Sequence, residues 1–128
     1  MSLFDSSAII NLCGERKIDP LLEGKTLSLA FYEIGNAVWR QIHIHKVITR
    51  EEGDIVLDSL MEVVRRMEKI EVERPLEILR IAVEENLTYY DASYLQAAIE
   101  KDLTLITDDK KLYVTGKKYI ETLKSDEI

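Results

Sequence analysis

The chain has 128 residues, 46% hydrophobic and 32% charged, so it is long enough for one folded domain and too apolar to be disordered. Its single cysteine excludes an internal disulfide and favours a reducing compartment such as the cytoplasm, and no apolar run reaches the ~20 residues of a membrane span. A net charge of −7 by itself argues against a nucleic-acid-binding protein. We expect residues 1–128 to form a single domain.

The N-terminal part of the chain predicts one strand and two short helices. Residues 3–4 are apolar and read as a strand that ends at Asp5. Residues 7–13 predict a short helix. Asp19, which proline follows, is typical of a helix start and is expected to be the N-cap of the second helix.

The middle of the chain predicts a second strand followed by two long helices. Residues 26–30 read as a buried strand. Apolar residues then recur every four positions, which predicts a helix whose inner face is formed by Ile34, Val38 and Ile42. Thr49 and Glu52 have the spacing of a capping box and predict the start of the other long helix.

The C-terminal half alternates strands with helices. We expect further strands at residues 69–73, 103–107 and 118–123. A helix opened by Pro75 is expected to turn four side chains inward, namely Leu76, Leu79, Ala82 and Val83. Another helix begins after Thr88. The alternation predicts a parallel sheet with helices on both faces, and ligands in such folds bind beyond the carboxyl ends of the strands.

Acidic side chains gather at those strand ends. Asp5 follows the first strand, Glu33 lies in the first turn after the second, and Asp91 begins the helix that leads to the fourth. Asp108 and Asp109 directly follow the fourth strand. Carboxylates packed together repel one another, and a divalent cation removes that repulsion. Hard oxygen ligands select Mg²⁺ or Mn²⁺, which suits phosphodiester hydrolysis.

Four segments together resemble the PIN domain family, in particular the toxin nucleases of VapBC-type toxin–antitoxin pairs. They are "FDSSAI", "YEIGNAV", "TYYDASYLQAA" and "LITDDKKL", and their order and spacing match along essentially the whole chain. The resemblance implies a three-layer α/β fold with a central parallel sheet of order 3-2-1-4-5. It implies a metal-dependent ribonuclease whose catalytic metal ligands are Asp5, Glu33, Asp91 and Asp109.

The resemblance also implies supporting residues and partners. Ser7 is expected to help position the metal or its water, and Thr107 and Asp108 to support the site. An RNA substrate, a homodimer and an antitoxin are implied, and the antitoxin's C-terminal segment would lie over the acids. We expect it to offer an Arg or Lys there, because a cation replaces the charge of the metal. The long helices, including Trp39, are expected to form the dimer contacts.

Structural interpretations compete for several of these residues. Thr88 and Asp91 have the spacing of a capping box, and an acid there also suits the helix dipole. Asp108 could be a simple N-cap of the turn at residues 108–113. His43 and His45 do not indicate a metal pair, because positions two apart on a helix point about 200° apart. Among the tyrosines, three could stack on bases or pack at a helix edge: Tyr89, Tyr90 and Tyr94.

Basic residues near the acids are candidates for RNA contact, although a solvated face is an equally good interpretation. Lys110 and Lys111 follow Asp109, and Arg40 and Lys46 lie beyond Glu33 on or after the same helix. The four proposed ligands account for more than half of the excess of seven negative charges.

Three other functions are alternatives to a ribonuclease. A phosphorelay receiver needs an aspartate after a middle strand, and residues 69–73 are followed by none. A haloacid-dehalogenase phosphatase needs D-x-D after the first strand, where this chain has Asp5-Ser6-Ser7. A non-catalytic PIN-fold interaction module is the remaining alternative, and the presence of all four acids argues against it.

Overall fold

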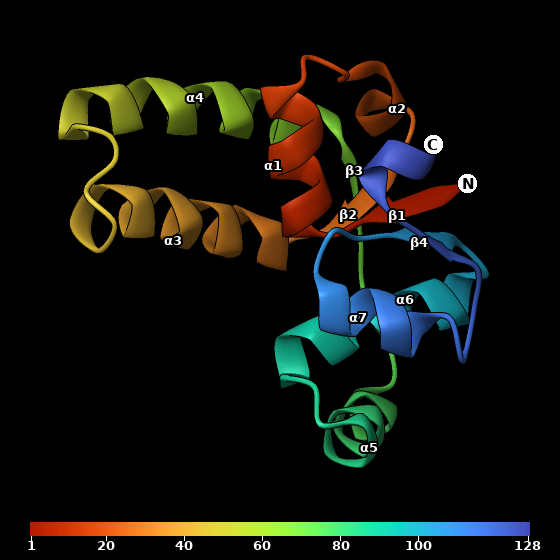
Figure 1. Cartoon of the computed structure of the whole chain (residues 1–128). Helices are drawn as coiled ribbons and strands as arrows, with labels where there is room; N and C mark the ends of the chain where they lie inside the picture. Colours follow the sequence, from red (N-terminus) through yellow and green to blue (C-terminus); the bar gives the residue numbers. More distant parts are fainter.

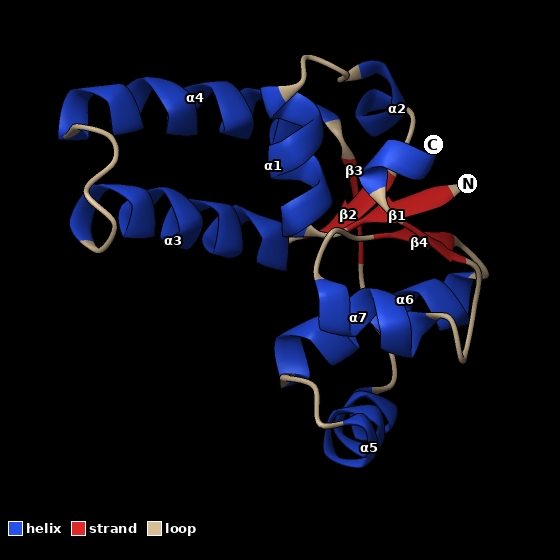
Figure 2. Cartoon of the chain, viewed as in Figure 1, coloured by secondary structure: helices blue, strands red, loops and turns tan.

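A five-stranded parallel sheet forms the centre of the computed structural model, which describes residues 1–128 (Figures 1 and 2). The strand order is β3-β2-β1-β4-β5, as predicted. The strands are β1 (Ser2–Phe4), β2 (Lys25–Leu27), β3 (Glu68–Ile70), β4 (Thr104–Ile106) and β5 (Thr122–Leu123). The helices are α1 (Ser6–Gly14), α2 (Asp19–Leu22), α3 (Leu29–His43), α4 (Arg50–Arg66), α5 (Pro75–Glu85), α6 (Tyr89–Lys101) and α7 (Lys110–Gly116), followed by a 3₁₀ turn, η1 (Ser125–Glu127).

Helices cover both faces of the sheet, which confirms the predicted three-layer α/β class. One apolar core joins the sheet to α1, α3 and α4, and includes Phe4, Ile9, Ile34 and Val64. The other joins it to α5, α6 and α7, and includes Leu3, Ile81, Leu95 and Leu112. Successive side chains of a strand point to opposite faces, so Leu3 and Phe4 each enter a different core. No helix is both long and apolar enough to cross a membrane.

Strand β2 is shorter than predicted, because the helical pattern begins earlier. The strand ends at Leu27, and Leu29 already belongs to α3. Ala30, Ile34 and Val38 are all buried at a spacing of four, which is the helical repeat. Glu33 therefore lies in the second turn of α3 and not in the first.

The inner face of α5 also differs from the prediction. Ile78, Ile81 and Ala82 are buried, so only Ala82 of the predicted face is correct. The other three predicted residues are exposed: Leu76 (79%), Leu79 (51%) and Val83 (73%). The helix carries two overlapping apolar faces at similar spacing, and periodicity alone does not say which one the sheet covers. A smaller error concerns α2, where Ile18 is the N-cap and Asp19 makes no capping hydrogen bond.

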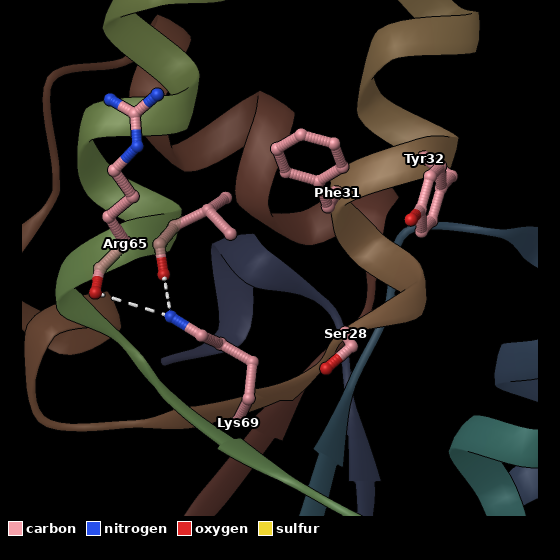
Figure 3. A pocket seen from close by; sticks show the side chains of 6 residues that line it. Ser28, Phe31, Tyr32, Arg65 and Lys69 are labelled. Atoms are coloured by element: carbon pink, nitrogen blue, oxygen red, sulfur yellow. Dashed lines mark hydrogen bonds between the residues drawn. The ribbon is translucent and has the colours of Figure 1, made fainter.

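Both ends of α4 are capped by side chains. Thr49 and Glu52 form the predicted capping box, with bonds of 3.1 and 2.8 Å to each other's backbone N–H. At the other end, Lys69 Nζ donates to the carbonyl oxygens of Val64 (2.7 Å) and Met67 (2.8 Å) and, more weakly, of Arg65. Figure 3 shows the bonds to Val64 and Arg65. The lysine thus adds side-chain hydrogen bonds at the C-terminal end of the helix, where regular backbone partners run out. It also borders a pocket of about 350 Å³, but is already committed to the helix end.

Replacing Gly24 by alanine should destabilise the fold. Its Cβ would clash with Cε2 of Phe4, a buried ring on the strand that leads to Asp5. Forcing the ring aside should lower the free energy of unfolding by about 1–3 kcal/mol, measured by urea denaturation. Gly35→Ala is the matched control, because its Cβ meets nothing within 4 Å. That helical site should gain about 1 kcal/mol. Equal effects of the two substitutions would contradict the packing.

Candidate functional site

Asp5 is a buried carboxylate at the end of the central strand β1. Its side chain is 3% exposed. Oδ1 accepts hydrogen bonds from Ser7 Oγ (2.7 Å) and the Ala8 backbone N–H (2.9 Å), and Oδ2 accepts one from the Thr107 hydroxyl. Burial raises the pKa of Asp5 to about 6, although these hydrogen bonds oppose the rise. The carboxylate therefore caps α1 and is also costly to ionise.

Ser7 and Thr107 connect the ends of β1 and β4. Thr107 is fully buried, and its Oγ1 accepts a 3.1 Å hydrogen bond from the backbone N–H of Asp109. Ser7 Oγ likewise accepts a 3.0 Å bond from the N–H of Asp108. Both hydroxyls thus hold Asp5 on one side and the turn after β4 on the other. The structure places both hydroxyls against the Asp5 carboxylate, and their expected role in supporting a metal site stays a prediction.

Asp91 lies in the first turn of α6 with its carboxylate largely free. Thr88 Oγ1 caps the helix by accepting from the Asp91 N–H at 3.0 Å, but the reciprocal bond of a capping box is absent. Burial, then the negative charges of Asp109 and Glu33, raise the pKa of Asp91 to about 6. Capping therefore uses the backbone of Asp91 and leaves its side chain facing two other acids.

Glu33 is oriented by a residue whose role the sequence did not reveal. Tyr94 is fully buried and its hydroxyl donates a 2.8 Å hydrogen bond to Glu33 Oε1. This burial excludes the base-stacking role considered for Tyr94. Partial burial raises the pKa of Glu33, which the Tyr94 and Ser6 hydroxyls partly offset. The available signal was the spacing of Tyr94 from Asp91, since residues three apart share a helix face.

The two aspartates after β4 point to different surroundings. Asp109 is the N-cap of α7: its Oδ1 accepts from the Leu112 N–H at 2.8 Å, and its charge acts on Asp91. Asp108 accepts from Asn11 and from the N–H and hydroxyl of Ser125. Desolvation by burial raises the pKa of Asp108, but these hydrogen bonds outweigh it, so the pKa is lowered. Asp108 thus links the C-terminal segment to the end of β4. The N-cap of α7 is Asp109, so the interpretation of Asp108 as the N-cap is wrong.

The four acids suit a hydrated divalent ion better than a bare one. No group of three His, Cys, Asp or Glu side chains is close enough to enclose an ion directly. None of the four forms an ion pair with a lysine or arginine. Mg²⁺ commonly keeps several waters and takes one or two carboxylates, so an oxygen-only cluster of this kind fits it. The four residues fit a divalent ion because their donor atoms are all carboxylate oxygens, and because no ion pair offsets the repulsion between these carboxylates.

A polar groove leads from Glu33 along α3. It has a volume of about 390 Å³ and is lined mainly by polar side chains, including Asn36, Arg40, Gln41 and His45. His43 instead stacks on Trp39, with ring centroids 5.2 Å apart, so the two histidines face different surroundings. On the other side of the acids, Lys110 and Lys111 open α7. Arg40, Lys46, Lys110 and Lys111 form no ion pair.

Comparison with known proteins assigns the chain to a family. The family model "PIN domain" matches residues 3–118. The chain belongs to the PIN domain family. The crystal structure of PAE2754 from Pyrobaculum aerophilum superposes with a TM-score of 0.82 at 30% identity, covering 98% of this chain and 91% of that one. Two curated relatives from the same organism place it among the VapC-type PIN proteins.

Both relatives match most of the chain. "Exonuclease VapC9" is 36% identical over 96 residues, which cover 74% of this chain and 68% of the relative. "Ribonuclease VapC3" is 31% identical over 103 residues, covering 77% and 75% respectively. The PIN fold and the VapC type therefore stand on sequence and structure together.

The contribution of Asp5 to the stability of the metal-free protein should fall as the pH rises from about 4 to about 7. Asp5 titrates near pH 6 when folded and near pH 4 when unfolded, so in this window the folded state holds the extra proton. A shift of about two pKa units corresponds to at most about 3 kcal/mol. Asp5→Asn should flatten the pH dependence and raise stability at pH 7, measured by urea denaturation with a chelator present.

Asp108→Asn provides a control of opposite sign. Its pKa is lowered, so its carboxylate contributes stability above its unfolded pKa that is lost as the pH falls. The substitution should destabilise the protein at pH 7. A parent protein whose stability rises steadily from pH 4 to pH 7, and an Asp5→Asn variant with the same curve, would contradict the account of Asp5.

Proposed function

We propose that this protein is a metal-dependent ribonuclease that hydrolyses phosphodiester bonds in RNA, and that it is the toxin of a toxin–antitoxin pair. The observation that carries the proposal is the mutual repulsion at Asp91, which lies within reach of the charges of Asp109 and Glu33 with no basic partner in contact. Such an arrangement is unfavourable for an empty fold and favourable around a cation. The names of the VapC relatives support the same activity.

Each protein group has a separate task in the proposed site. Asp5, Glu33, Asp91 and Asp109 would hold Mg²⁺ or Mn²⁺, which when bound lowers the pKa of a water molecule and offsets charge on the phosphate. Ser7 and Thr107 fix the Asp5 carboxylate through both of its oxygens. Tyr94 holds Glu33 through one oxygen, Oε1. Because these hydroxyls are held by the sheet and α6, the carboxylates would need little rearrangement during the reaction.

RNA would approach between two groups of unpaired cations. Arg40 lines the groove beside Glu33, Lys46 directly follows the groove residue His45 in the chain, and Lys110 and Lys111 lie beyond Asp109. The positive charge of Lys111 already acts on Asp91. Most other bases of the chain pair with acids or cap a helix, so these four remain available for phosphates. The net charge of −7 is then no obstacle, because much of it belongs to the site.

The partners expected for this proposal are a second copy of the chain and an antitoxin. Trp39 is 49% exposed and is available for the predicted dimer contact on the long helices. The exposed stripe of Leu76, Leu79 and Val83 on α5 is a further apolar surface open to a partner. An antitoxin Arg or Lys would enter the acid cluster as a substitute for the metal charge. The alternative, a non-catalytic interaction module, does not explain why Glu33, Asp91 and Asp109 gather at one edge of the sheet without an ion-pair partner.

Asp5→Asn and Asp91→Asn should each reduce cleavage of single-stranded RNA in Mg²⁺ by at least about 100-fold, since even indirect neighbours of a metal cost 10- to 100-fold. Neither should unfold the protein, because each removes a repelling charge. Asp102→Asn is the matched control: it makes the same charge change at the other end of α6, and asparagine tolerates the left-handed backbone there (φ 52°). Parent-like cleavage by both site variants would show the site to be misassigned.

Changing Lys110 and Lys111 together to Glu should weaken RNA binding across sequences and flatten its salt dependence. Each phosphate contact on a single strand contributes a slope of about 0.7 in log affinity against log salt. Mn²⁺ binding should persist, because neither lysine is a ligand. Lys117→Glu with Lys124→Glu is a charge-matched control, since both lysines lie over the Tyr113 ring instead. Unchanged affinity and slope in the first variant would show that RNA enters from another side.

A further inference from the structure

A pocket of about 470 Å³ lies at the carboxyl ends of β2 and β3, beside the start of α6. Its floor is apolar and belongs to the core, with Leu27 and Ile78 almost fully buried. Its rim carries two exposed aromatic rings, Tyr89 (43%) and Tyr90 (59%). Neither tyrosine hydroxyl has a hydrogen-bond partner in the protein. The pocket is therefore an open, mainly apolar hollow bordered by two tyrosine rings.

The pocket and the carboxylate cluster share two helices, α3 and α6. Tyr90 directly precedes Asp91 on α6, and Leu29, which lines the pocket, lies one turn before Glu33 on α3. Strand β3 is two strands away from β1, which sets the end of β3 about 10 Å from Asp5. A ligand held at the acids can therefore place a second group in the pocket.

One charged side chain lines the pocket. Glu71 follows β3, is exposed, and forms neither a hydrogen bond nor an ion pair within the chain. A carboxylate accepts two parallel hydrogen bonds from a group that offers two adjacent N–H donors. Among the four RNA bases only guanine presents such a pair on its Watson–Crick edge, from N1 and the 2-amino group.

We propose that this pocket holds one base of the RNA substrate and selects guanine, with Tyr89 and Tyr90 against the base and Glu71 accepting from its Watson–Crick edge. Base stacking on aromatic side chains is the usual device of single-strand binding. The carboxylate adds the discrimination that stacking lacks. The inference rests on the proposed ribonuclease function and adds a position-specific preference to it.

The test uses the full chain with Ca²⁺ and a uridine decamer that carries one central guanosine or one inosine, which lacks the 2-amino group. The parent should bind the guanosine decamer several-fold more tightly, because it keeps one more charge-assisted hydrogen bond. Glu71→Gln should reduce the guanosine-to-inosine affinity ratio to about one. Glu68→Gln is a control for charge, since Glu68 pairs with Lys25 outside the pocket and should leave the ratio unchanged.

Cross-linking locates the base directly. The same decamer with 6-thioguanosine at the centre should photo-cross-link to the peptide that contains Tyr89 and Tyr90, and Tyr90→Leu should reduce the yield. Tyr32→Leu is the control, because Tyr32 is 71% exposed and lines a different pocket. RNA cleavage with cross-links only elsewhere, or a guanosine preference that Glu71→Gln does not change, would overturn the base pocket alone. If the parent neither binds nor cleaves RNA, that result would overturn the ribonuclease function as well as the base pocket.

Discussion

The arrangement of the whole site depends on the hydrogen bonds that hold the buried Asp5 carboxylate between β1 and β4. Thr107 and Ser7 donate to its two oxygens, and the same hydroxyls accept from the backbone of the turn that carries Asp109. The register of β1 against β4 is thereby linked to the position of two acids that lie about a hundred residues apart. Loss of this linkage would change the geometry of the site before it changed the fold.

The burial of Asp5 also destabilises the ionised form of its carboxylate. Asp5 and Asp91 both have a pKa raised to about 6, and at neutral pH the apo protein pays that penalty without a cation to offset it. Stability and function oppose each other here: the Tyr94 hydroxyl keeps Glu33 beside the other acids when repulsion would separate them. A bound divalent ion would convert this penalty into binding free energy.

The sequence predicted the layers, because each strand and helix leaves a local signal, and it placed acids at the strand ends. The strand order came only from the resemblance to the PIN domain family, and the role of the acids as metal ligands stays a prediction. An apolar run in the sequence marks each strand and its end. The spacing of Thr49 and Glu52 alone predicts the start of α4. The sequence alone could not show which side of α5 faces the core, because Leu76 and Ile78 belong to equally apolar stripes. Nor could it separate Asp108 from Asp109 by physics, since their difference arises from Ser125 and Asn11, which only the folded chain brings near. Tyr94 was missed because its partner lies 61 residues away.

The central claim is that Asp5 and Asp91 share a divalent ion, and proton release on Mn²⁺ binding tests it most directly. Titration calorimetry at pH 6 in two buffers of different ionisation enthalpy gives the number of protons released. Two carboxyls that titrate near pH 6 are each about half protonated there, so binding should release about one proton at pH 6 and almost none at pH 8. Mn²⁺ binding without proton release at pH 6, or no binding at millimolar Mn²⁺, would contradict the account.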